Sequence, residues 1–258
     1  MLKRLAEKYK RYEFVFSELV NRDFKKKYKR SFLGILWSML APMFILMVLF
    51  YVFRYIFGNT QPHYIIYLFS GLLMFQYYSD ATNGAMMALV SNAGIFSKVN
   101  VPKYLFLFSR VVSSTINLAF EMVVYFVFTA VDGVPFTWKF ILLLFPIGCL
   151  FALNIGVGLI ISALYVFFKD IQHLYGVFTT ALMYFTPIFY GAEMLGEHAF
   201  IFNINPLYLY INYVREIVIY GRIPPLTYHA ACLAFAAAAV TAGMMIYKKY
   251  NHRFLYYV

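Results

Sequence analysis

The chain has 258 residues, of which 63% are hydrophobic and only 13% are charged, about half the charged fraction of an ordinary soluble domain. This composition excludes a soluble globular protein, and the apolar segments leave no room for a soluble catalytic domain of ordinary size. Lysine and arginine outnumber aspartate and glutamate by 22 to 11, so the distribution of the basic residues predicts the topology.

Residues 12–30 are predicted to form an amphipathic helix along the inner membrane surface. Phe16, Leu19, Val20 and Phe24 fall on one face at the helical period, and most of the basic residues fall elsewhere. Such a helix lies in the interface with its basic residues near anionic lipid. A docking surface for a cytosolic protein is the alternative interpretation, whereas nucleic acid is not needed to explain this charge.

Six transmembrane helices are predicted from apolar runs that are each long enough to cross the hydrocarbon core. The predicted spans are 32–57, 63–90, 104–131, 138–167, 171–190 and 226–247. Eighteen of the 22 basic residues then share the side of the N-terminal segment, which predicts that both termini are cytosolic. The alanine-rich last span allows close helix packing, within one protomer or between two.

Residues 191–222 are too rich in glycine, asparagine and proline for a full span. We expect a re-entrant pair of short helices between spans 5 and 6, which must be buried in protein or line a cavity. The predicted fold class is therefore an all-α integral membrane protein. It consists of a single domain over residues 1–258, with the interfacial helix at 12–30, the six-span core at 32–247 and the re-entrant outer segment at 191–222.

Three stretches of the sequence resemble one family. Residues 19–38 read LVNRDFKKKYKRSFLGILWS, with Pro42 beyond, and residues 95–103 read IFSKVNVPK. The third stretch is FFKDI at 167–171, followed by FTPIFY at 185–190 and NPL at 205–207. In this order they resemble the permease subunits of ABC-2 type exporters of cell-surface polysaccharides.

This resemblance implies a homodimeric channel in the bacterial plasma membrane that works with two copies of a separate ABC ATPase. Its substrate would be an undecaprenyl-type lipid-linked polysaccharide, such as O-antigen, capsule or wall teichoic acid, moved from the cytosol to the outer face. The sequence departs from the commonest pattern, with Asn-Val-Pro-Lys where Phe-Pro-Arg is frequent and Thr-Pro where Ser-Pro is frequent. These departures leave the exported polymer open.

No G-x-x-x-x-G-K-[ST] phosphate-binding loop occurs in the chain. We therefore expect a non-catalytic permease without a cofactor of its own, with ATP and Mg²⁺ bound by the partner ATPase. One alternative is an ABC-2 type exporter of drugs or small lipids. Another is a membrane-embedded glycan-modifying transferase, which should carry a catalytic carboxylate or histidine pair near an interface.

Two segments are predicted to contact the ATPase, because both are expected in the cytosol and neither is needed to span the membrane. One is the interfacial helix and the other is the loop after the second span. The candidate coupling residues are Arg22, Asp23, Lys25, Lys26, Tyr28, Ser97, Lys98, Pro102 and Lys103.

Aromatic side chains are predicted to line the substrate path, since flat rings pack against the apolar faces of sugars. On the fifth span four of them fall within about 80° at the helical period, and on the first span three cluster with an arginine on their flank. They are Tyr175, Phe178, Phe185 and Phe189, and Phe44, Tyr51 and Tyr55 with Arg54. Packing against lipid or core is the alternative for the rings. The arginine could bind a carrier phosphate or extend to the interface. The resemblance, in which these two spans look like the channel walls, favours the path.

Four polar side chains are predicted inside the membrane, where they must face protein or water because polar groups are costly in hydrocarbon. They are Asp80, Asn83, Asn117 and Glu121. A structural hydrogen-bonding role and a proton relay both stay open for them. No metal site is expected, since the two cysteines lie in apolar spans and the five histidines lack metal-ligand spacing.

Overall fold

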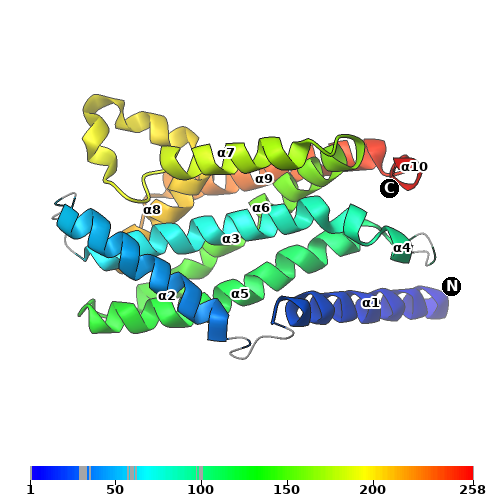
Figure 1. The fold of residues 1–258 in the computed structure, drawn as a ribbon, viewed down its shortest axis with the longest axis horizontal. Helices are drawn as coiled ribbons and strands as arrows, with labels where there is room; N and C mark the ends of the chain where they lie inside the picture. The colour runs from blue at the N-terminus through cyan, green and yellow to red at the C-terminus, as the bar shows by residue number, and fades with distance from the viewer. Residues whose placement is uncertain are drawn as a thin grey trace.

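The computed structural model describes residues 2–28, 34, 36–56, 58, 61, 63–96, 98 and 101–257, and this part of the chain is helical without a strand (Figure 1). The helices in chain order are α1 (Leu2–Tyr28), α2 (Leu36–Tyr51) with its π-helical extension η1 (Val52–Ile56), α3 (Tyr64–Ser91), α4 (Ala93–Phe96), α5 (Tyr104–Val131), η2 (Trp138–Leu143), α6 (Leu144–Phe167), α7 (Ile171–Phe185), η3 (Ala192–Ile204), α8 (Pro206–Val218), α9 (Leu226–Tyr250) and α10 (Phe254–Tyr257). The predicted all-α class is confirmed.

Four of the described helices are long and apolar enough to cross a membrane: Leu36–Ile56, Tyr104–Val131, Trp138–Phe167 and Leu226–Tyr250. The chain is therefore a multi-pass membrane protein. Helix α3 has the length of a span, but its polar residues, Asp80 among them, lower its hydropathy. Helix α7 has only 15 residues. The six-span count thus stays a prediction.

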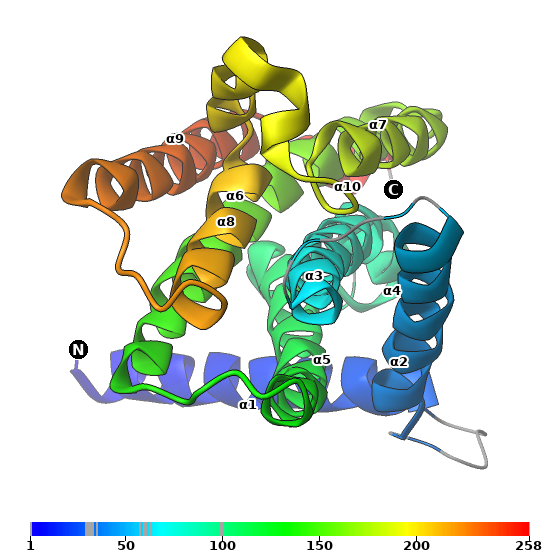
Figure 2. The ribbon, with the colours of Figure 1, turned by 90° about the vertical axis from the view of Figure 1, so that its left-hand side faces the viewer.

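Helix α3 lies at the centre of the molecule and contacts α2, α5, α6, α7 and α8 (Figure 2). It is buried on most of its circumference, with side chains from Tyr64 to Leu89 in the core. A helix surrounded by protein can carry polar residues, because neighbouring helices supply their partners. The central position of α3 therefore explains how this helix accommodates its polar residues.

Helices α6 and α9 pack with their backbones in contact. A Cβ atom added at Gly156 would lie 2.3 Å from the carbonyl carbon of Ala239, and one added at Gly243 would lie 2.5 Å from the carbonyl oxygen of Gly156. Small residues permit such close approach between membrane helices. At this point the small residues of the last span serve a contact within the protomer.

Helix α1 packs against α5 and runs across the view of Figure 2, in which α3 and α5 are seen nearly end-on. It begins at Leu2 and not near residue 12 as predicted. The preceding residues are mostly leucine, lysine, arginine, glutamate and alanine, which favour helix even without an apolar face. Both chain ends lie at the same end of the molecule as α4 (Figure 1).

The predicted fifth span is too long at its C-terminal end. Helix α7 ends at Phe185, and residues 186–190 form a series of bends. Pro187 lacks a backbone N–H, and it disfavours the helical conformation of Thr186 before it. The short helices of the outer segment are η3, which is kinked at Gly196, and α8.

Candidate functional site

Arg215 of α8 is a fully buried side chain that holds the bent segment 186–190. Its guanidinium donates hydrogen bonds to the carbonyl oxygens of Pro187 at 2.7 Å, Ile188 at 3.1 Å and Tyr67 at 3.0 Å. The guanidinium carbon also lies 3.4 Å from the centre of the Tyr67 ring. Carbonyl dipoles and an aromatic face therefore stabilise this buried charge.

Two tyrosines of α3 also donate hydrogen bonds to the bent segment 186–190. The Tyr64 hydroxyl donates to the Phe189 carbonyl at 2.7 Å, and the Tyr67 hydroxyl donates to the Tyr190 carbonyl at 2.8 Å. Each carbonyl from Pro187 to Tyr190 thus accepts a side-chain hydrogen bond. Since the segment is not helical, its buried carbonyls need such partners.

Asn205 joins the bent segment to α8. Its side-chain amide donates to the Thr186 hydroxyl at 2.8 Å, and its side-chain oxygen accepts from the backbone N–H of Leu207 at 3.0 Å. The second bond is an N-cap, which satisfies one of the free donors at the start of a helix. Two sequence stretches that lie 19 residues apart therefore form one structural unit.

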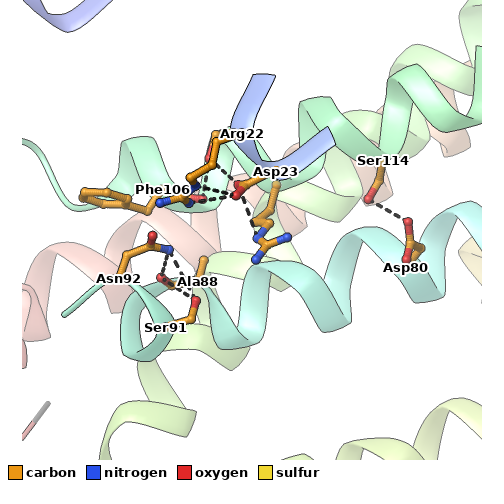
Figure 3. Close-up of polar contacts among 10 residues, drawn as sticks. Arg22, Asp23, Asp80, Ala88, Ser91, Asn92, Phe106 and Ser114 are labelled. Atoms are coloured by element: carbon orange, nitrogen blue, oxygen red, sulfur yellow. Dashed lines mark hydrogen bonds and ion pairs between the residues drawn. The ribbon is translucent and has the colours of Figure 1, made fainter. Parts of the chain in front are cut away.

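A second polar cluster locks α1 to α5. The Asp23 carboxylate is buried and pairs with Arg22 at 2.7 Å and with Arg110 at 3.3 Å. The Ser109 hydroxyl also donates to it at 3.4 Å. Figure 3 shows Asp23 with Arg22, and Asp80 of α3 with the hydroxyl of Ser114, which donates at 3.1 Å.

One cavity lies between α1, α3 and α5. It is lined by Asp23, one of the predicted coupling residues, and by two of the predicted intramembrane polar residues, Asp80 and Asn117. It has a volume of 380 Å³, and its lining consists of Asp23, Asp80, Gly84, Arg110, Ser113, Ser114 and Asn117. Asn83 instead donates to the Ser79 carbonyl of its own helix at 2.8 Å. Glu121 lines a different cavity of 410 Å³ between α2, α3 and α5, together with Trp37 and Gln76. The polar residues of α3 and α5 therefore form a seam through the apolar bundle.

Residues 15–219 match the family described as ABC-2 type transporter. The chain belongs to this family. It is 28% identical over 241 residues to the "O-antigen export system permease protein RfbA" of Klebsiella pneumoniae, with 92% of each chain covered. It is 25% identical over 256 residues to the protein of that name from Myxococcus xanthus, with 97% and 98% covered. It is 22% identical over 231 residues to the "Polysialic acid transport protein KpsM" of Escherichia coli, with 88% and 90% covered. The family resemblance is confirmed.

The predicted coupling residues of this ABC-2 type transporter chain have different environments. Asp23 is buried, so it is not part of a docking surface as predicted, whereas Lys25 and Lys98 are exposed. Lys103 donates to the Asn251 carbonyl at 2.8 Å, and burial lowers the pKa of its ammonium. Arg22 and Pro102 are half-buried. The side chains of Lys26 and Tyr28, and the whole of Ser97, lie outside the described residues.

The four aromatic residues predicted as one stripe on the fifth span do not share one exposed face, so this prediction is wrong. Tyr175 points into the core, where its hydroxyl donates to Thr82 at 2.7 Å. Phe189 lies beyond the end of α7, is 6% exposed and stacks on Phe53 with ring centres 5.1 Å apart. Only two of the four rings are exposed on the helix, Phe178 and Phe185.

The aromatic residues predicted to cluster on the first span are exposed in this structure. Phe44, Tyr51 and Tyr55 are exposed, and the rings of Tyr51 and Tyr55 lie 5.2 Å apart. Arg54 donates to the Gln61 carbonyl at 3.4 Å. Helices α2 and α7 both flank α3 (Figure 2).

Arg215 is a functional residue that the sequence analysis does not single out. Its sequence signal is an arginine within the mostly apolar helical stretch at 206–218. Arg110 is a second residue that the sequence analysis does not single out. Its signal is the polar helical period that it begins, which continues through Ser113, Ser114 and Asn117.

Proposed function

We propose that this chain is the transmembrane permease subunit of an ATP-driven exporter of lipid-linked polysaccharide. The observation that carries the proposal is the similarity over 92% of the chain to a relative named for O-antigen export. A relative named for polysialic acid transport covers 88% of the chain. The exported polymer is thus O-antigen, capsule or, by the wider family, wall teichoic acid.

The exporter contains two copies of this chain and two ABC ATPase chains, which bind ATP and Mg²⁺. The absence of a phosphate-binding loop from the sequence supports a separate ATPase. The exposed apolar face of α2 supports a second copy, since only 11% of its span is buried in the monomer. We place the chain in the bacterial plasma membrane with six spans, both termini cytosolic, and η3 and α8 as the re-entrant outer segment.

Reconstitution tests this function. The chain, together with its ATPase, is placed in liposomes with a lipid-linked glycan on the side of the ATPase. We expect movement of the glycan across the bilayer only with ATP, and none with an ATPase whose phosphate-loop lysine is replaced. The purified chain alone should bind no ATP. Movement that persists without ATP under an ion gradient would identify a secondary transporter, and movement of drugs but not glycans would favour the other ABC-2 alternative.

Reversing the charge of the exposed lysines should weaken the complex with the ATPase. In the double variant Lys25→Glu and Lys98→Glu, we expect recovery of the ATPase with the tagged chain to fall about tenfold, since charge reversal in a polar interface slows association and favours dissociation. Arg222→Glu is the control, because this exposed residue lies in the connection between α8 and α9. Equal recovery from the double variant and the control would leave lipid contact as the role of these lysines.

Removing the two exposed rings of α7 should slow export without affecting assembly. An aromatic stacking contact contributes about 0.5–1.5 kcal/mol beyond its buried area, so Phe178→Ala with Phe185→Ala should lower the export rate about tenfold. Leucine at both positions keeps apolar area but no flat face, and should export as slowly as alanine. Leu174→Ala with Val177→Ala is the matched control on the same exposed helix. Wild-type export by the leucine variant would show that the rings only pack.

A further inference from the structure

Residues 251–257 follow α9 and lie at the same end of the molecule as α4 (Figure 1). Within this segment Phe254 is fully buried, and α10, which begins at Phe254, packs against α6. The three residues before Phe254 are exposed. A buried aromatic ring holds the segment in place, because the ring returns to water if the segment is displaced.

The segment contacts the connection before α5 through Lys103. The Lys103 ammonium donates a hydrogen bond to the Asn251 carbonyl at 2.8 Å and lies 5.7 Å from the centre of the Phe254 ring. Asn251 is the C-cap of α9, and a lysine at this end of a helix satisfies a free carbonyl and the helix dipole. The ring adds a cation–π contact. Lys103 thus holds the start of α5 to the end of α9.

The same segment contacts the end of α6 through Phe167, the last residue of that helix. Three aromatic rings pack against Phe167, with ring centres at 5.6 Å for Tyr250, 6.0 Å for Phe254 and 4.9 Å for Tyr257. Aromatic pairs at such distances are favourable beyond the area that they bury. Phe254 is therefore shared between the contact to the start of α5 and the contact to the end of α6.

Both connections also have exposed residues that a partner can reach. Lys98 is exposed before α5, and Phe168 and Lys169 are exposed after α6. A protein that binds either of these surfaces displaces a connection that residues 251–257 join to the other one. Closely packed side chains pass on such a displacement, because the protein interior is hardly compressible.

We infer that residues 251–257 couple the connections 101–103 and 168–170, with Phe254 as the positioning residue. The inference rests on the proposed function, in which both connections are cytosolic and face the ATPase. Displacement of one connection by the ATPase passes through Lys103 and Phe254 to the other, so that α5 and α7 move together. Phe254 acts through these neighbouring side chains and not by contact with the exported glycan.

The ratio of glycan moved to ATP hydrolysed in liposomes tests this role. In Phe254→Leu, which keeps an apolar side chain but removes the ring, we expect the ratio to fall about fivefold, as for the loss of a ring contact. Lys103→Met should lower it likewise, whereas Lys103→Arg keeps a cation that donates and stacks and should restore most of it. Phe136→Leu is the matched control, since Phe136 packs on Phe140 at 5.0 Å beyond the other end of α5.

The double variant Lys103→Met with Phe254→Leu shows whether the two residues act together. We expect the double variant to lower the ratio no further than either single variant, because residues that act through one contact are not additive. Effects that multiply in the double variant would overturn the inference. A wild-type ratio in Phe254→Leu would overturn it equally.

Amide hydrogen exchange in the complex with the ATPase, without glycan or ATP, separates this inference from the proposed function. One reporter is the N–H of Phe106, which donates to the Lys103 carbonyl at 3.3 Å. The other is the N–H of Gln172, which donates to the Lys169 carbonyl at 3.2 Å.

Phe254→Leu should speed exchange at both reporters about fivefold, and the Phe136→Leu control should change neither. Faster exchange at only one reporter, or at neither, would overturn the inference. A wild type that moves no glycan with ATP would refute the proposed function instead, and the exchange result would still decide whether the two connections are joined.

Discussion

Replacing Arg215 with methionine is expected to abolish export and to destabilise the protein by several kcal/mol. The change leaves the buried Ile188 carbonyl without its side-chain donor and the Pro187 carbonyl with only a 3.5 Å bond from the Tyr67 hydroxyl, whereas the Tyr67 carbonyl keeps the Ser70 hydroxyl at 2.8 Å. A buried acceptor that loses its partner costs about 1–3 kcal/mol, so two such losses are a large part of the stability of a typical domain, about 5–15 kcal/mol. The measurements are the thermal unfolding midpoint in detergent and the export rate in liposomes.

Arg215→Lys separates charge from geometry at this site. Lysine keeps the positive charge, but it lacks the planar fork that reaches several carbonyls and stacks on an aromatic ring. We therefore expect an intermediate loss of stability and a large loss of export. Arg222→Met is the control, because Arg222 is exposed in the connection that follows α8. Wild-type stability of Arg215→Met would contradict the assigned role of the guanidinium.

Gly156→Ala is expected to separate α6 from α9 and to destabilise the chain by about 1–3 kcal/mol, the usual cost of overpacking. The added Cβ would lie 2.3 Å from the backbone of Ala239, and backbone atoms in a helix cannot turn aside as a flexible side chain does. Gly243→Ala should behave in the same way. Denaturant unfolding in mixed micelles measures both effects.

Gly148→Ala is the matched control on the same helix. No atom lies within 4 Å of a Cβ added there, so the change should be neutral or stabilise α6 by up to about 1 kcal/mol through helix propensity. If Gly156→Ala and Gly148→Ala unfold alike, the backbone contact between α6 and α9 is not what holds these helices together.

Several elements were predictable from local sequence properties. The spans 104–131 and 138–167 were predicted with the observed ends, Val131 and Phe167. Long apolar runs specify such helices by themselves, because a membrane span satisfies its backbone within one segment. Turn residues then end it, as Gly133 does with a φ of 77° after α5. The membrane class and the family were also predicted from local stretches of sequence, namely the apolar runs and the motifs.

The partners of the functional side chains depended on contacts between distant segments. Phe189 was predicted on the face of a continuing helix, yet the bend at Pro187 turns it onto Phe53. Asp23 was predicted on a surface, yet α5 covers it.

What the sequence by itself determined is the all-helical membrane class, the family, the C-terminal ends of α5 and α6 and the polar positions of α3 and α5. Only the tertiary structure decided which of those polar positions share a cavity, that Arg215 bonds to carbonyls of residues as distant as Tyr67, 148 positions away, and that Gly156 approaches Ala239. The physical reason is that helical periodicity describes one helix at a time. The partner of a buried polar group, and the space left for a Cβ, are set by a second helix whose position depends on the packing of the whole bundle.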